Sequence, residues 1–339
     1  MDSLTQAALG AAVAYGFWHR QLGRTSLVLG GALGTLPDLD ILVYPFLDDV
    51  QRLYWHRGES HSIWFVICGG LFLGLMINKL RGRNQLSTGK AITGVSVVFA
   101  THIIIDYFTI YGTQLLAPVS RYGFARGNMF IIDPLYTTPL LVGIIVAGTV
   151  KGGVGRLANV AGISLSTLYA IFSLLSHAYA DHIFKHQLAA RNITVLNSMT
   201  GATPMNTFLW RHVARTPDGF LIGYFSVIGN DSDAPIRFDH VPQNEDLLDE
   251  YKGQRNVDVL EWFSKGFWMA SQKENDVIVS DLRFGEFRFN ENDPPEKWQF
   301  IFAWSITGDP DRLIRHSRAI RNSKAALSIL WRRLIGTIY

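Results

Sequence analysis

The chain has 339 residues, of which 48% are hydrophobic and 17% are charged, and its mean hydropathy is +0.14. Soluble proteins carry more charge, about 25%, so the composition favours a membrane protein. The net charge is only +3, and the basic residues gather in short loops, which gives no support to nucleic-acid binding. The single cysteine, Cys68, excludes an internal disulfide and a zinc site built from cysteines.

Charged residues divide the chain into two regions. Of the 59 Asp, Glu, Lys and Arg residues, 21 lie in residues 1–184 and 38 in residues 185–339. We therefore predict a helical membrane domain over residues 1–184 and a soluble domain over residues 185–339. The first apolar stretch has no basic region ahead of it, so we expect it to be retained and not cleaved as a signal peptide.

The first region contains six apolar segments. They cover residues 4–18, 27–43, 62–77, 91–111, 129–150 and 157–183. A transmembrane helix needs about 20 apolar residues, so the last three are long enough, whereas the first three are short and are either tilted or re-entrant. Gly30 and Gly34 have the four-residue spacing that permits two helices to approach closely, although plain packing also explains it.

The connectors between these segments indicate their orientation. Lys and Arg concentrate in residues 19–24, 79–90 and 151–156. Because these residues favour the cytoplasmic side, we place the three connectors inside. If all six segments cross the membrane, residues 44–61, residues 112–128 and the C-terminal domain lie outside, which in a bacterium is the periplasm. Four arginines in the outer connectors oppose this assignment: Arg52, Arg57, Arg121 and Arg126.

The second region has short alternating runs of apolar and polar residues, which are typical of strands. A helix is predicted over residues 244–270, so we expect a small α+β domain. Residues 325–339 predict an amphipathic helix that either lies on the membrane surface or packs on its own domain. The predicted strands cover residues 220–227, 277–289 and 299–306.

Polar residues interrupt the apolar half, where they are costly unless they are paired or functional. His102 and Asp106 are four residues apart in a predicted helix, so both lie on one face, as two ligands of one metal ion require. A hydrogen-bonded His–Asp pair inside a bundle explains these two equally well. The predicted topology, however, brings Asp38 and His61 to the same outer level. Carboxylates and imidazoles together suit zinc or another divalent first-row metal, so we favour a metal site.

The predicted metal ligands are Asp38, His61, His102 and Asp106. Asp40 and His56 are further ligands if the site holds two ions. Glu59 is a candidate general base acting on water, with a solvated loop acid as the alternative. Arg57 is a candidate for binding a phosphate or a developing oxyanion, with a surface loop charge as the alternative.

Two other polar groups have structural explanations. Asp133 precedes Pro134 and fits the N-terminus of a helix better than a partner of a metal ligand. His177 and Asp181 form a second His-x-x-x-Asp pair, which more often marks a solvated exit from the membrane than an extension of a site. The sequence has no phosphate-binding Gly-rich loop with Lys, no Gly-x-Ser-x-Gly and no Cys-x-x-Cys motif.

Several motifs of the first half occur in a recognisable order. They are Met-Asp-Ser-Leu-Thr-Gln at residues 1–6, Pro-Asp-Leu-Asp at 37–40, His-Arg-Gly-Glu-Ser-His-Ser at 56–62, and His102 to Asp106 followed by Tyr-Gly-Thr-Gln at 111–114. Together they resemble the bacterial YdjM-like inner-membrane family. The resemblance covers the membrane half and implies a membrane-bound metal-dependent hydrolase, distantly grouped with zinc-dependent phospholipase C. Many members have Thr-His where this chain has Thr5-Gln6, which implies one imidazole fewer here.

These observations lead to one functional hypothesis and two alternatives. We expect a multi-pass inner-membrane hydrolase in which one or two zinc-like ions activate water against a phosphoester or lipid-linked substrate at the outer face. The first alternative is a non-enzymatic membrane protein whose metal site is structural or serves transport. The second is a membrane anchor for a periplasmic binding module. No oligomeric state follows from the sequence.

Overall fold

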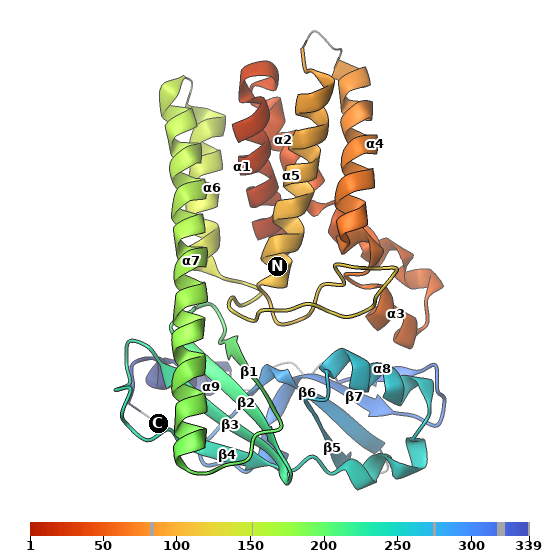
Figure 1. The fold of residues 1–339 in the computed structure, drawn as a ribbon, viewed down its shortest axis with the longest axis vertical. Coiled ribbons are helices and arrows are strands. Elements are labelled where there is room, and N and C mark those ends of the chain that lie inside the picture. The colour runs from red at the N-terminus through yellow and green to blue at the C-terminus, as the bar shows by residue number, and fades with distance from the viewer. Residues whose placement is uncertain (82–84, 151, 274–275, 317–322, 338–339) are drawn as a thin grey trace. The chain divides into compact units, whose positions relative to one another are not determined.

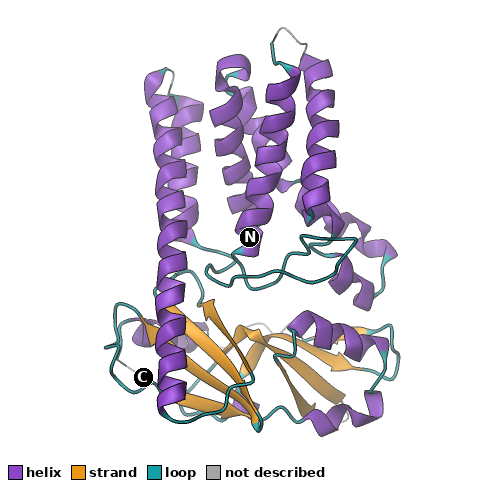
Figure 2. Cartoon of the chain, viewed as in Figure 1, coloured by secondary structure: helices purple, strands orange, loops and turns teal. Residues whose placement is uncertain are grey.

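The computed structural model describes residues 1–81, 85–150, 152–273, 276–316 and 323–337. The chain forms two compact units. The first comprises Met1–Pro45, Tyr54–Ser173 and Pro204–Asn206, and the second Phe46–Leu53, Leu174–Thr203 and Thr207–Tyr339. Figure 2 shows that helices and loops build the first unit and that the second mixes helices with strands. The predicted boundary at residue 184 falls within α7 (Gly153–Ala190), which contributes to both units.

Helices of the first unit begin where the sequence supplies caps. Asp2 precedes α1 and accepts a hydrogen bond from the backbone N–H of Thr5. Asp133 caps α6 and accepts from Leu135 N–H at 3.1 Å, with Pro134 at the first helical position. The predicted helix role of Asp133 is therefore confirmed. The elements are α1 (Ser3–Leu22), α2 (Thr25–Thr35), η1 (Pro37–Phe46), η2 (Glu59–His61), α4 (Ile63–Arg81), α5 (Thr88–Tyr107), α6 (Pro134–Thr149) and the first part of α7.

Three described helices are long and apolar enough to cross a membrane, namely α4, α5 and α7. A fourth candidate is the pair of α2 and η1, which bends by 46° at its break and is either a broken span or a re-entrant loop. α6 is apolar but has only 16 residues, fewer than we expected for that segment. The helical region thus has three to four candidate spans. The six-segment threading and its sidedness stay predictions, and Arg83 and Lys151 of the basic connectors lie outside the described residues.

Glycines bring α1 and α2 into close contact, which the four-residue spacing of Gly30 and Gly34 permits (Figure 1). A Cβ on Gly10 would lie 2.4 Å from the carbonyl oxygen of Gly30. A Cβ on Gly34 would lie 2.5 Å from the carbonyl oxygen of Gln6. Only residues without side chains fit here, so the two backbones touch. The core of this unit includes the fully buried Trp18.

The second unit contains two antiparallel four-stranded sheets, each in chain order. The predicted strands correspond to β3, β6 and β7. The helix predicted over residues 244–270 is divided into η3 (Glu245–Tyr251) and α8 (Arg255–Ser264), with Gly253 at positive φ between them. It also ends early, because Lys265 and Gly266 adopt positive φ and end α8 before the strand Trp268–Lys273 begins. The strands are β1 (Asn197–Ala202), β2 (Leu209–Thr216), β3 (Gly219–Ser226), β4 (Phe238–Val241), β5 (Trp268–Lys273), β6 (Asp276–Phe287), β7 (Gln299–Ile306) and β8 (Leu313–Arg315); the short helices are α3 (Asp49–Trp55), η3 (Glu245–Tyr251), η4 (Pro295–Lys297) and α9 (Ser323–Leu334).

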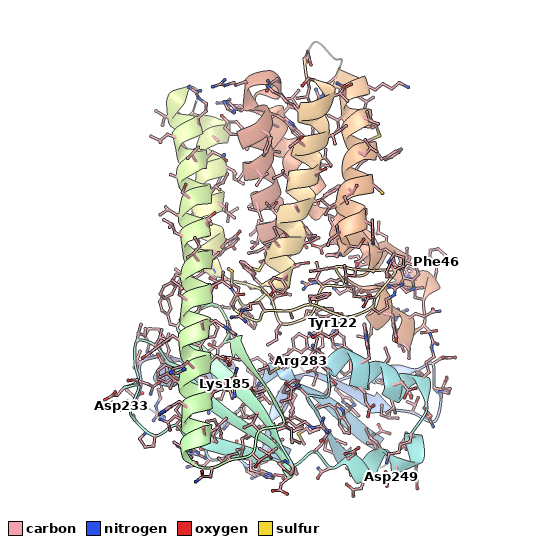
Figure 3. The ribbon with its side chains drawn as sticks, viewed as in Figure 1. Phe46, Tyr122, Lys185, Asp233, Asp249 and Arg283 are labelled. Carbon is pink, nitrogen blue, oxygen red and sulfur yellow. The ribbon has the colours of Figure 1, made fainter. Side chains whose placement is uncertain are left out.

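The C-terminal part of α7 packs on the first sheet, where Phe184 joins a buried cluster with Trp210. The second His–Asp pair attaches the helix to β1. His177 is buried, with Nε2 3.0 Å from the carbonyl oxygen of Thr200, and Asp181 accepts from the hydroxyl of Thr200. Asp181 also pairs with Lys185, which Figure 3 labels. The expectation of a solvated exit is therefore wrong for His177, because tertiary contacts with the sheet bury it.

Buried ion pairs join the two sheets of the second unit. Arg211 on β2 donates to Glu286 on β6 at 2.9 Å, and Arg288 donates to the same carboxylate at 2.8 Å. Burial alone would raise the pKa of Glu286, but the two guanidinium groups outweigh it and lower that pKa to about 2. Glu286 is therefore ionised at neutral pH, and removing either arginine would leave a buried charge without part of its compensation.

Candidate metal centre

Three elements of the first unit bring two carboxylates and two imidazoles together. Asp38 lies at the start of η1, directly after the break at which Pro37 ends α2. His61 ends the short helix η2. His102 and Asp106 are on one face of α5, one turn apart, as their spacing predicted. The side chains of the last three are at most 1% exposed, whereas that of Asp38 is 19% exposed.

The four donor atoms converge on one point and lie within 4.8 Å of one another. His61 Nε2 is 3.1 Å from His102 Nε2, 3.2 Å from Asp38 Oδ1 and 3.2 Å from Asp106 Oδ2. His102 Nε2 is 3.5 Å from Asp38 Oδ1 and 3.7 Å from Asp106 Oδ2. In a tetrahedral zinc site with ligand distances of about 2.0–2.1 Å, ligand atoms are roughly 3.3–3.4 Å apart. The separations therefore fit one divalent ion at the centre.

Hydrogen bonds on the far side of the imidazole of His102 fix its orientation. Its Nδ1 is 2.7 Å from the carbonyl oxygen of Gly34, which can only accept, so Nδ1 carries the proton. In the neutral ring the lone pair is then on Nε2 and faces the centre. Ser60 Oγ lies 2.9 Å from Nδ1 of His61 and holds that ring similarly. Both imidazoles thus present Nε2, as metal-binding histidines with an outer hydrogen-bond partner do.

Asp106 uses its two oxygens differently. Oδ1 accepts from Gln6 Nε2 at 3.0 Å, lies 3.2 Å from a terminal nitrogen of Arg57, and contacts the amino group of Met1. Oδ2 faces the centre and, although buried, accepts no hydrogen bond from the described residues. A buried carboxylate oxygen without a donor is rare, and a cation at the centre would satisfy it. The chemistry of the donor set therefore fits a metal ion.

The charges around His61 have the same implication. Burial alone would lower the pKa of His61, but the carboxylates of Asp106 and Asp38 raise it above its ordinary value of 6.5. The cluster thus attracts positive charge. A divalent ion would meet this demand with two carboxylates and two neutral imidazoles as ligands.

Asp40 and His56 lie beside the four-residue cluster and pair with each other. His56 Nδ1 is 3.2 Å from Asp40 Oδ1, and the second oxygen of Asp40 accepts from the backbone N–H of Arg57 at 2.9 Å. That oxygen is also 3.9 Å from His61 Nδ1. Asp40 therefore supports the loop that carries His61, and its role in binding a second ion stays a prediction.

Arg57 and Glu59 occupy different surroundings. Arg57 is 2% exposed, so the interpretation as a surface loop charge is wrong. It donates to Thr109 Oγ1 at 2.8 Å and stacks on the ring of Tyr111. Glu59 pairs with Arg121, and both side chains are about one-third exposed. Arg121 thus balances the negative charge of Glu59. The role of Glu59 as a general base stays a prediction.

Sequence reasoning missed two contacts that support the cluster, although the family resemblance singled out Gln6 as the position of an absent imidazole. Gln6 on α1 donates to Asp106, and a polar residue in an apolar helix is a signal that could have indicated this contact. The carbonyl of Gly34 orients His102. Every residue has a carbonyl, so no sequence signal marks it.

The first unit thus defines a helical membrane protein with a buried Asp/His cluster that could bind a metal ion. The family model described as YdjM inner membrane protein matches residues 1–180, which include all four cluster residues. The chain belongs to this family, as its motifs suggested. Neither the curated proteins nor the solved structures gave a match.

Gln6 offers a direct test of the ligand count. Its Oε1 is buried and accepts no hydrogen bond from the described residues, while its Nε2 lies 3.0 Å from Asp106. We expect Gln6→His to raise the affinity for zinc about tenfold, because an imidazole adds a nitrogen donor beside the cluster. Competition with a chromogenic chelator measures this, with Gln6→Leu as the control. Equal affinity of wild type and Gln6→His would show that position 6 lies outside the coordination sphere.

Proposed function

We propose that this protein is a membrane-bound metal-dependent hydrolase acting on a phosphoester or lipid-linked substrate. The observation that carries the proposal is the convergence of four donor atoms, from Asp38, His61, His102 and Asp106, in a buried site. Zinc is the metal that this donor set suits best. A divalent ion held there would supply Lewis acidity and lower the pKa of water toward about 7.

The chain's own residues would bind and orient the substrate. Asp38 is the one partly exposed member of the cluster, so the substrate would approach from its side. Arg57 is buried with its Nε–H donating to no described residue, and an anionic substrate oxygen would satisfy this donor. The same guanidinium holds Asp106, so it would position a ligand and a phosphate together. Glu59 would accept a proton from water once its ion pair with Arg121 has opened.

The location of the site is part of the proposal. The basic connectors favour the cytoplasm, which would put the cluster and the second unit on the periplasmic face of the inner membrane. The family is described as inner membrane protein, which supports the membrane but leaves the side open to test. A second ion, held with the help of Asp40 and His56, would complete a two-metal site.

The experiment uses the purified full chain in bilayers, loaded with zinc and, separately, with manganese. Phosphomonoesters, phosphodiesters and phospholipids are the substrates. We expect hydrolysis of at least one class, abolished by a chelator and restored by metal. Glu59→Gln should lower kcat while retaining metal, and Asp249→Asn, in an exposed segment of the second unit, is the matched control. Fully metal-loaded protein that hydrolyses none of the substrates would overturn the proposal.

A structural metal site is the second candidate, and one observation favours it. A central ion would join η1, η2 and α5 through Asp38, His61 and Asp106, and Gln6 of α1 would support it by its hydrogen bond to Asp106. If the site is structural, removing the metal with a chelator should lower the thermal unfolding temperature of the protein. The protein should then hydrolyse no substrate at any metal loading. Measuring unfolding and turnover on the same preparations separates the two.

A further inference from the structure

α9 presents an exposed apolar stripe. Leu327, Trp331 and Ile335 are 55%, 61% and 44% exposed. Leu327 and Trp331 are four residues apart in the helix and share one face of it, and Ile335 follows directly after the helix ends at Leu334. Single exposed apolar side chains are ordinary on a protein surface, but a row that includes a tryptophan indicates a binding surface.

The opposite face of α9 is fixed to the first sheet of its own unit. Ile329 and Arg333 are buried. The guanidinium of Arg333 lies 3.9 Å from the centre of the Tyr224 ring, and the carbonyl of Leu334 accepts a hydrogen bond from Ser226. The helix therefore packs on its domain with one face, as one of the two sequence alternatives stated. These attachments hold the stripe in its outward orientation.

The charge around the stripe has a single sign. Lys324 and Arg332 are exposed beside it. From Arg312 to Tyr339 the sequence has seven Lys and Arg residues and no Asp or Glu. A basic helix with Leu and Trp on one face has the composition of helices that lie in the headgroup region of anionic membranes. Tryptophan in particular favours that interface.

We propose that a surface formed by Lys324, Leu327, Trp331 and Arg332 of α9, together with Ile335 just after the helix, binds an anionic lipid surface. Charge complementarity selects phospholipid headgroups as the occupant, and the candidate spans of the same chain hold the protein at a bilayer. The three apolar side chains enter the headgroup boundary while the two cations pair with phosphates. The second unit is thereby restrained at the membrane surface.

The test uses the full chain in nanodiscs, in a Cys68→Ser background so that one cysteine carries the probe. Trp331→Cys is labelled with an environment-sensitive fluorophore. Asp233→Cys, at the exposed position labelled in Figure 3, is the matched control. In phosphatidylglycerol bilayers we expect blue-shifted emission at position 331, with about threefold stronger quenching by brominated acyl chains than in phosphatidylcholine. Position 233 should respond equally in both.

Charge and salt distinguish lipid from other occupants. Lys324→Glu together with Arg332→Glu should bring the quenching at position 331 down to the phosphatidylcholine level, and high salt should act in the same direction because it screens exposed charges. Equal quenching in both lipids would overturn the proposal.

Discussion

Replacing His102 with alanine or Asp106 with asparagine is expected to abolish stoichiometric metal binding by the purified protein. Each residue supplies one of four converging donor atoms in a buried site. Loss of a hydrogen bond that merely supports a ligand costs about 10–100-fold in metal affinity, so loss of the ligand itself should cost more. Asp106→Asn keeps the shape of the side chain and removes the charge, which separates ligand chemistry from packing.

Elemental analysis of metal per chain, before and after reconstitution with zinc, measures this result. His182→Ala is the matched control, since His182 is exposed on α7 and lies outside the cluster. It should retain the wild-type content. Metal content that is unchanged in Asp106→Asn would contradict the site. If the wild-type protein takes up no metal, the cluster is a hydrogen-bonded polar network inside a helical bundle and not a metal site.

Gly34→Ala is expected to weaken both the fold and the metal site, although it changes no charged residue. The added Cβ would lie 2.5 Å from the carbonyl oxygen of Gln6 and 3.0 Å from Gly10 Cα, which are backbone atoms. α1 and α2 must then separate, at a cost of about 1–3 kcal/mol. The carbonyl of Gly34, which orients His102 through a 2.7 Å contact, moves with the backbone. We therefore also expect a roughly 10–100-fold loss of metal affinity.

Gly31 supplies the control for this experiment on the same helix. A Cβ on Gly31 would have its nearest neighbour, the carbonyl oxygen of Ala7, at 3.6 Å, which is an ordinary contact. Gly31→Ala should unfold no earlier than wild type, because alanine favours a helix more than glycine does, and it should match wild type in metal affinity. If Gly34→Ala unfolds earlier but binds metal normally, the Gly34 carbonyl does not hold His102 in place. If both variants behave as wild type, the helices are not in backbone contact.

Much of the fold follows from local patterns in the sequence. Hydropathy indicated a helical N-terminal region, and alternation indicated β3, β6 and β7. The extent of single elements depended on more distant groups. The predicted helix over residues 244–270 ends early because the chain turns at Lys265 and Gly266 into a buried strand. Local periodicity cannot reveal a strand whose hydrogen-bonding partner is β6.

The sequence by itself determined that His102 and Asp106 share a helix face, because the α-helical repeat sets that spacing. It also determined that Gly30 and Gly34 permit a close helix contact. Tertiary structure decided which of the neighbouring polar residues converge. Asp38 and Asp40 are two residues apart in η1, so their directions around a 3₁₀ helix differ by about 120°, and Asp38 is the one that meets His102.

Tertiary structure also decided the supporting groups. The amide of Gln6 and the carbonyl of Gly34 reach α5 only because α1 and α2 pack against each other without intervening side chains. Arg57, in a loop with positive φ, is buried only because Asp106 and Thr109 receive its guanidinium. Such contacts depend on how distant segments pack. No residue type marks a side chain that will be buried or a backbone carbonyl that will accept a hydrogen bond, so local sequence cannot predict them.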